Sequence, residues 1–260
     1  MPFSQWILLN VPTAVIGLVM FIVAVGIAVG GVLLVRRYVD VSKFKHHHDI
    51  AGPIFSTVGV IYAVMLAFVL VVVWQDFDRA SNNVVKEATC YAEIDRDSIG
   101  LSEPFRSKFR AAQNDYIDAL IDDEWKLLAV GKKSPEAQRL ADNIWNMVAS
   151  YEPGTEGEKA FFAEMLNRMN NAVEMRRQRL VDSQTGIHPA LWFVLLFGGI
   201  ITIVFTFFFG SENLVAQLIM TTLLAMLIVS ILFTILVMDF PFSGDLSISP
   251  DALQLILLRK

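Results

Sequence analysis

Three histidines followed by an aspartate form the most conspicuous group of possible metal ligands in the sequence. The run consists of His46, His47, His48 and Asp49. Imidazole and carboxylate groups commonly bind transition metals, but adjacent residues of a helix or strand point in different directions and do not converge on one ion. The spacing also matches no zinc pattern. We therefore predict no metal site and no cofactor, and interpret the run as part of a basic loop.

Two acidic residues, Asp76 and Asp78, come directly after a long apolar segment that ends at Trp74. In a ring of subunits, such carboxylates would form an acidic collar that concentrates cations and repels anions. The alternative is that they are solvated residues of an exposed helix, since exposed acidic residues are common. Both interpretations place them just outside an apolar segment.

Small and uncharged polar residues recur inside the apolar segments, mostly at three- or four-residue steps. One face carries Gly52, Ser56, Gly59, Ala63 and Ala67, a second carries Gly198 and Gly199, and a third carries Gln217 and Thr221. Small residues let helices approach closely in lipid, and polar residues either join helices or line water. The spacing leaves open whether these faces pack within one subunit or around an oligomer axis. Ser56, Gln217, Thr221, Asp76 and Asp78 are the candidate pore or selectivity residues.

Sequence signatures of catalysis are absent. The chain contains no G-x-S-x-G, H-E-x-x-H, G-x-G-x-x-G or G-x-x-x-x-G-K-[ST] string, so the common hydrolase, metalloprotease and nucleotide-binding motifs are missing. Its longest apolar segments also lack the ionisable groups that pumps and ion-coupled transporters use. We predict that the protein is not an enzyme, and an intramembrane enzyme is the weakest of three hypotheses.

The apolar segments of the sequence indicate which helices carry these residues. Hydrophobic residues make up 55% of the 260-residue chain and charged residues 18%, compared with about 45–50% and 25% in soluble domains. Residues 1–35, 50–75, 183–211 and 213–238 contain no Lys, Arg, Asp or Glu. Crossing a bilayer takes roughly 20 helical residues, and lipid requires the backbone to satisfy its own hydrogen bonds. The predicted transmembrane helices are Thr13–Val35, Ile54–Trp74, His188–Phe209 and Leu214–Met238.

Residues 76–188 differ in composition and are predicted to form a soluble helical bundle. They carry fifteen Lys or Arg and twenty Asp or Glu, which gives them the same net charge of −5 as the whole chain. An apolar stripe of helical period extends the second transmembrane helix toward Gly100. Its members are Phe77, Ala80, Val84, Ala88, Tyr91 and Ile94.

Local signals divide the rest of this insert into helices. Ser102-Glu-Pro is predicted to cap a second helix that ends near Gly131, and Ser134-Pro135 is predicted to start a third. Thr155 and Glu158 have capping-box spacing for a last helix over about 157–181. The predicted inner face of this last helix consists of Phe161, Met165, Met169 and Val173.

The chain is therefore predicted to be an all-α, polytopic membrane protein with four regions. Residues 1–75 hold the first two transmembrane helices and their basic connecting loop, 76–188 the bundle, 189–239 the last two transmembrane helices, and 240–260 a tail with a short docking helix. Short loops rich in Lys and Arg favour the cytoplasm, which places 36–53 inside. The acidic bundle and both termini are then outside, although Arg176, Arg177 and Arg179 favour the opposite orientation. We expect a bacterial inner membrane.

Several strings resemble the family of bestrophin-like integral membrane proteins. They are His47–Phe55, Gly59–Leu70, Trp74–Phe77, Glu87–Ala88, Phe197–Thr202, Phe208–Asn213 and Asp239–Asp245. The similarity covers nearly all of the chain and marks as family-motif positions His47, Asp49, Tyr62, Trp74, Asp239, Pro241 and Gly244. His48 stands where the family pattern has Asn, which leaves any polar role of that position open.

The resemblance implies a relation to bestrophin chloride channels, which are oligomers with a pore on the symmetry axis and a cytosolic soluble portion. That cytosolic placement differs from the orientation favoured by the basic loop, and an outward acidic collar would disfavour anions. A homo-oligomeric ion channel or channel-like pore is the leading hypothesis, with membrane lipid, further copies of the chain and ions as partners. The alternative is a non-conducting membrane scaffold or sensor whose acidic bundle binds a partner. The net charge of −5 argues against nucleic acid, and the single cysteine, Cys90, excludes a disulfide within the chain.

Overall fold

A computed structural model describes residues 2–38, 48–208 and 213–257, and within these ranges every regular element is helical. Four helices are long and apolar enough to cross a membrane, and the prediction of an all-helical chain with four such helices is confirmed. The helices are α1 Phe3–Asn10, α2 Thr13–Tyr38, α3 His48–Asp97, α4 Phe105–Ala119, α5 Trp125–Leu128, α6 Pro135–Ala149, α7 Glu156–Asp182, α8 Pro189–Phe207, α9 Leu214–Met238 and α10 Asp251–Leu257. A 3-10 turn at Ser98–Gly100 follows α3, and a π-helical turn at Leu120–Glu124 joins α4 to α5.

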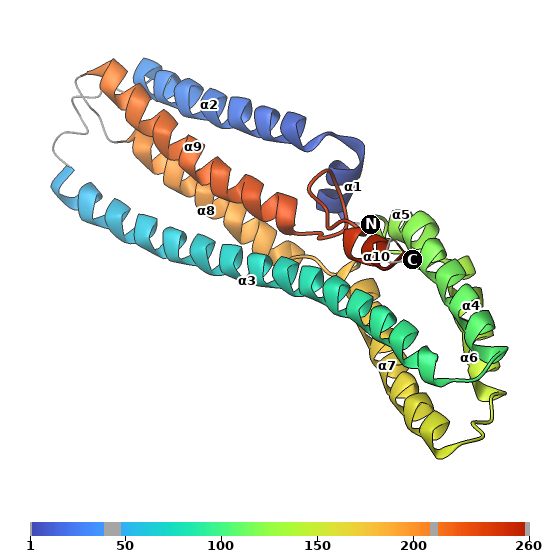
Figure 1. The fold of residues 1–260 in the computed structure, drawn as a ribbon. Helices are drawn as coiled ribbons and strands as arrows, with labels where there is room; N and C mark the ends of the chain where they lie inside the picture. Colours follow the sequence, from blue (N-terminus) through green and yellow to red (C-terminus); the bar gives the residue numbers. More distant parts are fainter. Residues whose placement is uncertain (1, 39–47, 209–212, 258–260) are drawn as a thin grey trace. The chain divides into compact units, whose positions relative to one another are not determined.

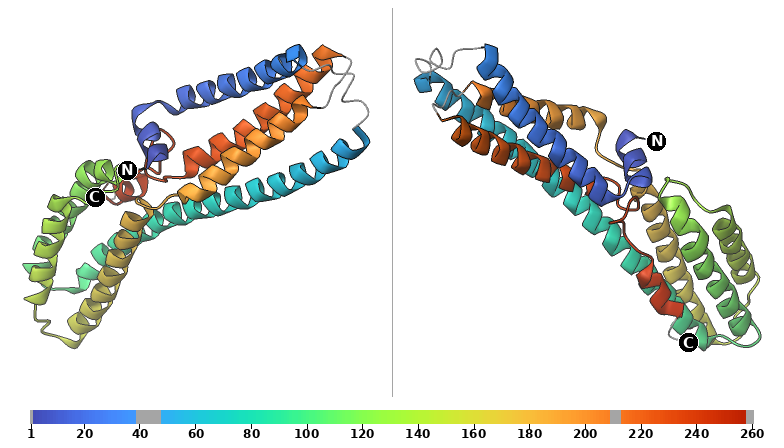
Figure 2. Two further views of the ribbon diagram at one scale, coloured as in Figure 1. Left: turned by 180° about the vertical axis from the view of Figure 1, so that it is seen from behind. Right: turned by 90° about the horizontal axis from the view of Figure 1, so that it is seen from above.

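The chain divides into two compact units, and α3 contributes to both (Figure 1). The membrane unit comprises residues 6–75 and 186–239, and the second unit, called here the bundle unit, comprises residues 1–5, 76–185 and 240–260. Figure 2 shows the helices of each unit from two further sides. The tail 240–260 therefore belongs to the same unit as most of the predicted insert 76–188. Residues 186–188 belong to the membrane unit.

The membrane unit consists of α2, the first half of α3, α8 and α9. Its α2 contacts α9 and α8, and α8 contacts α9. Glycines allow close approach at two of these contacts: a Cβ at Gly31 would lie 2.2 Å from the Phe207 ring, and one at Gly17 would lie 3.2 Å from Phe233. The main apolar core cluster of this unit consists of Ala24, Ala28, Val32, Tyr62, Leu66, Val73, Leu195, Ile203, Phe207, Ala225, Ile228, Leu232 and Ile235.

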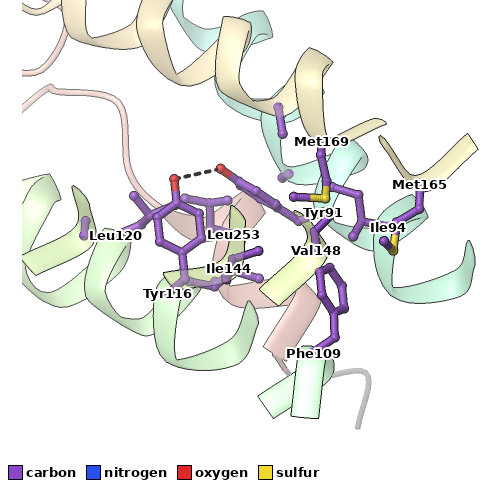
Figure 3. Packing of buried hydrophobic residues seen from close by; sticks show 14 of the residues in the cluster. Tyr91, Ile94, Phe109, Tyr116, Leu120, Ile144, Val148, Met165, Met169 and Leu253 are labelled. Atoms are coloured by element: carbon purple, nitrogen blue, oxygen red, sulfur yellow. Dashed lines mark hydrogen bonds between the residues drawn. The ribbon is translucent and has the colours of Figure 1, made fainter. Parts of the chain in front are cut away.

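The bundle unit has its own apolar core between α3, α4, α6, α7 and α10 (Figure 3). The predicted stripe on α3 is buried in this unit from Ala80 to Ile94, and Phe77 is half-buried. Leu253 of the short C-terminal helix α10 is completely buried in the same core. The aromatic rings of Tyr91 and Tyr116 meet edge to face, with their hydroxyl oxygens 3.3 Å apart.

Helix ends in the bundle unit mostly follow the local signals. Ser134 caps α6 by accepting a hydrogen bond from the Ala137 N–H, and Thr155 and Glu158 form the predicted capping box of α7. Gly131 has a positive φ of 68°, and its N–H donates to Leu128 O at the end of α5. This backbone conformation favours glycine, so the predicted helix stop is confirmed.

Two local predictions are wrong. Ser102 does not cap α4, because the helix begins at Phe105 and the Glu103 carboxylate accepts a hydrogen bond from the Ser107 N–H instead. On α7, Met165 and Met169 are buried as expected, but Phe161 and Val173 are 47% and 44% exposed. Residues four positions apart point about 40° apart around a helix, so residues at repeated four-residue steps move away from one face. The inner face of α7 therefore continues through Ala172, Arg176 and Arg179 instead.

Candidate functional site

The face of α3 that carries Gly52, Ser56, Gly59, Ala63 and Ala67, called here the small-residue face, is not covered by other parts of the described chain. Ser56, Ala63 and Ala67 are exposed, and both glycines are half-exposed. A Cβ added at Gly52 or Gly59 would meet no described atom within 4 Å outside the local helix backbone. The Ser56 hydroxyl donates to Gly52 O in its own helix. Within the described residues, no other helix packs against this face.

A different face of α3 packs inside the membrane unit, centred on Tyr62, Leu66 and Val73. The Tyr62 hydroxyl donates to Leu195 O at 2.9 Å. A Cβ at Gly198 would lie 2.6 Å from the Tyr62 ring, and one at Gly199 would lie 2.8 Å from its hydroxyl oxygen. The two glycines of α8 thus leave the space that the Tyr62 side chain occupies.

The two candidate pore residues of α9 are buried and do not form part of an exposed face. Gln217 and Thr221 are each 3% exposed, and Gln217 accepts a hydrogen bond from Arg36 Nε at 2.9 Å. Both line a pocket of about 280 Å³ that is otherwise mostly apolar and includes Phe55 and Leu224. Gln217 and Thr221 are thus buried, whereas Ser56, which the sequence grouped with them, is exposed.

The two acidic residues beyond the apolar part of α3 differ in their surroundings. Asp76 forms an ion pair with Arg79 at 2.8 Å, whereas Asp78 is exposed and accepts a hydrogen bond from Asn82. Asp78 follows Ala67 by eleven residues, about three helical turns, whereas Asp76 follows it by nine, about two and a half turns. Of the pair, only Asp78 shares the helical phase of the small-residue face.

Asp239 joins two segments of the membrane unit at the end of α9. Its Oδ1 accepts the Ile187 N–H at 2.6 Å and its Oδ2 accepts the Trp192 indole N–H at 3.2 Å. Pro241 follows it and is buried, and Gly244 has a positive φ of 86°. Among the other family-motif positions, Trp74 is 61% exposed. His47 and the Asp49 side chain lie outside the described residues, as do residues 209–212.

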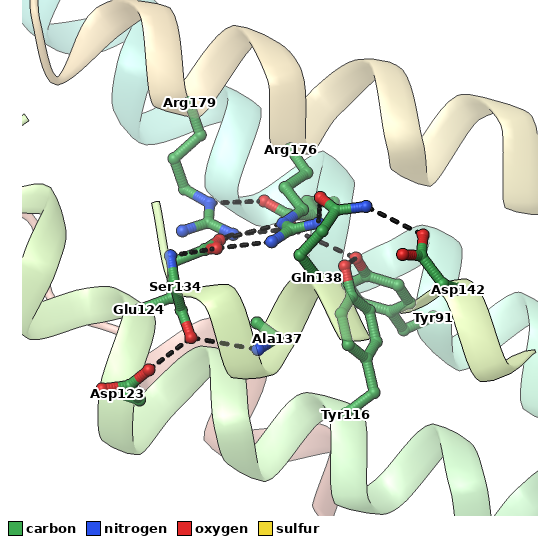
Figure 4. Close-up of polar contacts among 11 residues, drawn as sticks. Tyr91, Tyr116, Asp123, Glu124, Ser134, Ala137, Gln138, Asp142, Arg176 and Arg179 are labelled. Carbon is green, nitrogen blue, oxygen red and sulfur yellow. Dashed lines mark hydrogen bonds and ion pairs between the residues drawn. The ribbon is translucent and has the colours of Figure 1, made fainter. Parts of the chain in front are cut away.

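A cluster of four charged side chains occupies the middle of the bundle unit (Figure 4). Arg179 and Glu87 are completely buried, and Arg179 donates from Nε and Nη2 to the two Glu87 oxygens at 2.7 and 2.9 Å. Arg176 donates to both Glu124 oxygens at 2.9 and 2.5 Å, and Arg179 reaches Glu124 at 3.1 Å. Bidentate arginine–carboxylate pairs of this kind are strong and directional.

Aromatic rings surround these charges. The Arg179 guanidinium lies 4.9 Å from the Trp125 ring centroid, and that of Arg176 lies 5.6 Å from the Tyr116 centroid. Burial alone would raise the pKa of Glu124, but the Arg176 hydrogen bond and both guanidinium charges outweigh it and hold the pKa below its usual range. Burial raises the pKa of the Tyr116 hydroxyl to about 12. The cluster thus pairs two carboxylates with two guanidiniums, and their formal charges cancel.

The π-helical turn explains how Glu124 enters the core. Tyr116, Leu120, Glu124 and Leu128 are all buried at four-residue intervals. In an α-helix three such steps would drift by about 120°, and the wider π-turn at 120–124 takes up this drift. Such turns are common at functional sites.

This cluster was not predicted from the sequence, although the sequence contains a signal for it. Glu87 lies within the apolar stripe of α3, one position before Ala88. Arg176 and Arg179 continue the spacing of Met165, Met169 and Ala172 on α7. Charged residues at core positions on separate helices indicate buried ion pairs, because a lone buried charge is too costly.

No group of three His, Cys, Asp or Glu in the described ranges could hold a metal ion. The histidine run 46–48 is not covered by this statement, because residues 46 and 47 and the His48 side chain lie outside those ranges.

Comparisons with known proteins agree with the fold. A family model described as a Bestrophin-like domain matches residues 22–253. Two crystal structures of variants of a bacterial bestrophin homologue from Klebsiella pneumoniae match at 12% identity. One has a TM-score of 0.70 and covers 92% of this chain and 96% of that chain, and the other has a TM-score of 0.69 and covers 91% and 97%. A variant of a membrane protein matches with a TM-score of 0.68 at 11% identity, covering 92% and 95%.

No curated protein matches the chain by sequence. The family model nevertheless extends from the first membrane-spanning helix to α10, and the solved structures share the fold over nearly all of the chain. The resemblance seen in the sequence is therefore confirmed, and the protein, an integral membrane protein with four apolar helices, belongs to the Bestrophin-like family.

Proposed function

We propose that the protein assembles with copies of itself into an ion channel, and that the small-residue face of α3 lines the pore. The observation that carries this proposal is the exposure of that face on a helix that crosses the membrane. A face of Gly, Ala and Ser leaves room for water between helices around an axis. Apolar segments without charges suit pores that conduct past backbone carbonyls and apolar constrictions.

The other exposed side of α3 has the opposite character and suits lipid. Ile61, Val64 and Phe68 are 65%, 50% and 68% exposed. Bulky apolar side chains of this kind gain nothing from lining water but are stable against acyl chains. The exposed surface of α3 is thus divided into a lipid half and a pore half, with Gln217 and Thr221 assigned to the chain's interior rather than to the pore.

Ion current tests this proposal directly. Purified protein in planar bilayers should conduct. Ala63→Phe should abolish the current because the ring fills the axis, whereas Val64→Phe, which exchanges one lipid-facing side chain for another, should conduct normally. A well-folded oligomer that stays silent would contradict the channel and favour the scaffold hypothesis.

For selectivity we propose that exposed Asp78 carboxylates attract cations at the pore mouth. Asp78→Asn should shift the reversal potential in a salt gradient toward lower cation preference. Asp76→Asn should change it less, because Arg79 already compensates Asp76. Equal shifts, or an anion preference in the wild type, would contradict this assignment.

For orientation we propose a bacterial inner membrane with the basic segment 36–53 in the cytoplasm and the acidic bundle unit outside. Four basic residues support this orientation: Arg36, Arg37, Lys43 and Lys45.

A further inference from the structure

The helix α3 carries two buried polar side chains that lie on one line along its axis. It is a single helix from His48 to Asp97 (Figure 1), and no Gly or Pro interrupts it after Gly59. Tyr62 and Glu87 are separated by 25 residues, which is about seven full turns at 3.6 residues per turn. They therefore share one helical phase, although one belongs to each unit.

Tyr62 opposes rotation of α3 within the membrane unit. Its hydroxyl donates to Leu195 O at 2.9 Å, and its ring lies against Gly198 and Gly199, where any side chain would collide with it. Turning α3 would break the hydrogen bond and move the ring out of the space that Gly198 and Gly199 leave for it. The contact is therefore specific for one rotation of the helix.

Glu87 does the same within the bundle unit. Both of its oxygens accept hydrogen bonds from Arg179, and the Tyr91 hydroxyl, one turn further along α3, donates to Oε1 at 3.2 Å. The apolar neighbours Val84 and Ala88 have no such directional requirement. Apolar cores tolerate alternative packing, whereas a bidentate pair accepts one geometry.

Burial of these charges is difficult to explain by stability alone. Replacing a buried ion pair with apolar residues is often neutral or stabilising, and specificity of arrangement is one reason that such pairs are retained. The arrangement at stake is the rotation of α3, since Ala63 and Ala67 lie about 100° and 140° around the helix from Tyr62.

We propose that Tyr62 and the Glu87–Arg179 pair are positioning residues that fix the rotation of α3, each within its own unit. Tyr62 thereby keeps the small-residue face turned away from the core of the membrane unit. The proposal rests on the proposed pore for its functional meaning. Its physical content, the rotation of one helix, is measured without ion current.

Spin labels at neighbouring positions report this rotation. In a Cys90→Ser background, Ala63→Cys and Val64→Cys are labelled separately, and collisions with a water-soluble relaxant and with oxygen are compared in liposomes. The native chain should show a clear contrast between the two positions. Absence of water at position 63 in the native chain would contradict the pore proposal, but the contrast in label mobility would still test the anchors.

The informative variant is Glu87→Met combined with Arg179→Met. It removes one charge of each sign, so Glu124 and Arg176 still compensate each other. Its readout lies within the bundle unit, where a label on the half-buried native Cys90 is compared with one at the exposed position Thr89→Cys in a Cys90→Ser background. The folded variant should lose the contrast in label mobility between these two positions, because this half of α3 then samples several rotations. An unchanged contrast in a folded, heat-stable double variant would overturn the proposal, since the pair would then be merely structural.

A second variant keeps the test decisive if the double variant fails to fold. Tyr62→Phe removes only the hydroxyl and leaves the ring against Gly198 and Gly199. It should reduce the contrast between positions 63 and 64, and an unchanged contrast there would again overturn the proposal. As the matched control, Glu136→Gln with Arg139→Gln removes an exposed ion pair on α6 and should leave both contrasts as in the native chain.

Discussion

At the scale of single residues, Arg179 carries the most deeply buried charge of the bundle unit. Three of its hydrogen bonds go to carboxylate oxygens of Glu87 and Glu124, and its planar group lies over Trp125. Desolvating a guanidinium is costly, and these partners offset that cost. Removing the Glu87 or the Glu124 carboxylate leaves the buried Arg179 guanidinium without full compensation. Substitution of either carboxylate should therefore destabilise the fold strongly.

Glu124→Gln should destabilise the protein in a pH-dependent way. Breaking a buried pair costs about 3–5 kcal/mol. Because the pKa of Glu124 is lowered in the folded chain, its contribution is complete above its unfolded pKa of about 4.3 and is lost as the pH falls through the folded value. Melting temperatures followed by tryptophan fluorescence should differ most near neutral pH and converge in acid.

The control for this experiment is Glu136→Gln, which removes an exposed carboxylate paired with Arg139. It should melt as the wild type does at neutral pH. A constant difference between wild type and Glu124→Gln across the whole pH range would show that the Glu124 charge is not what stabilises the fold.

Gly198→Ala should destabilise the membrane unit. The new Cβ would lie 2.6 Å from the Tyr62 ring, and overpacking of this kind costs about 1–3 kcal/mol. Gly26→Ala is the matched control, because a Cβ at this position of α2 meets no described atom within 4 Å outside the local helix backbone. Thermal unfolding in detergent should separate the two variants, and equal melting temperatures would refute the close contact.

At the scale of elements, one side of α3 packs in both the membrane unit and the bundle unit. Tyr62, Leu66 and Val73 pack against the membrane unit, and Ala80, Val84 and Glu87 pack within the bundle unit. Both sets lie on one side of an uninterrupted helix. The opposite surface is left to lipid or to other copies of the chain, so its small and bulky halves are the part of α3 on which assembly depends.

Single cysteines along α3 should show a helical pattern of reactivity. In a Cys90→Ser background, Ser56→Cys, Ala63→Cys and Ala67→Cys should react with a charged thiol reagent in liposomes and lose current on modification. Cysteines at Ile61, Val64 and Phe68 should be protected, because these positions face lipid in the proposed arrangement. If the bulky positions react and Ser56→Cys, Ala63→Cys and Ala67→Cys do not, the small-residue face does not line the pore.

At the scale of the whole molecule, the chain separates an apolar unit from a charged one. All of the net charge of −5 is matched by residues 76–188, and the four spans supply the apolar surface. Such a chain is stable only at the boundary of a membrane, which agrees with its membership of the Bestrophin-like family.

Labelling in intact cells should show on which side the bundle unit lies. Lys133 is exposed in the loop before α6, so Lys133→Cys in a Cys90→Ser background should react with an impermeant thiol reagent if the unit is outside. Cys90 itself is half-buried and makes a poorer reporter. Protection in intact cells with full reaction after lysis would place the unit in the cytoplasm and reverse the proposed orientation.

The sequence by itself determined that four helices cross a membrane and where most helices of the insert begin and end. Long charge-free segments have only one stable solution in lipid, and caps such as Thr155–Glu158 act over a few residues. The tertiary structure decided which face of α3 is left uncovered, that Gln217 is buried beside Arg36, and that Glu87 meets Arg179 across 92 residues of chain. These outcomes depend on contacts between distant helices, and a periodic pattern shows only that a residue faces inward, not which partner it meets there.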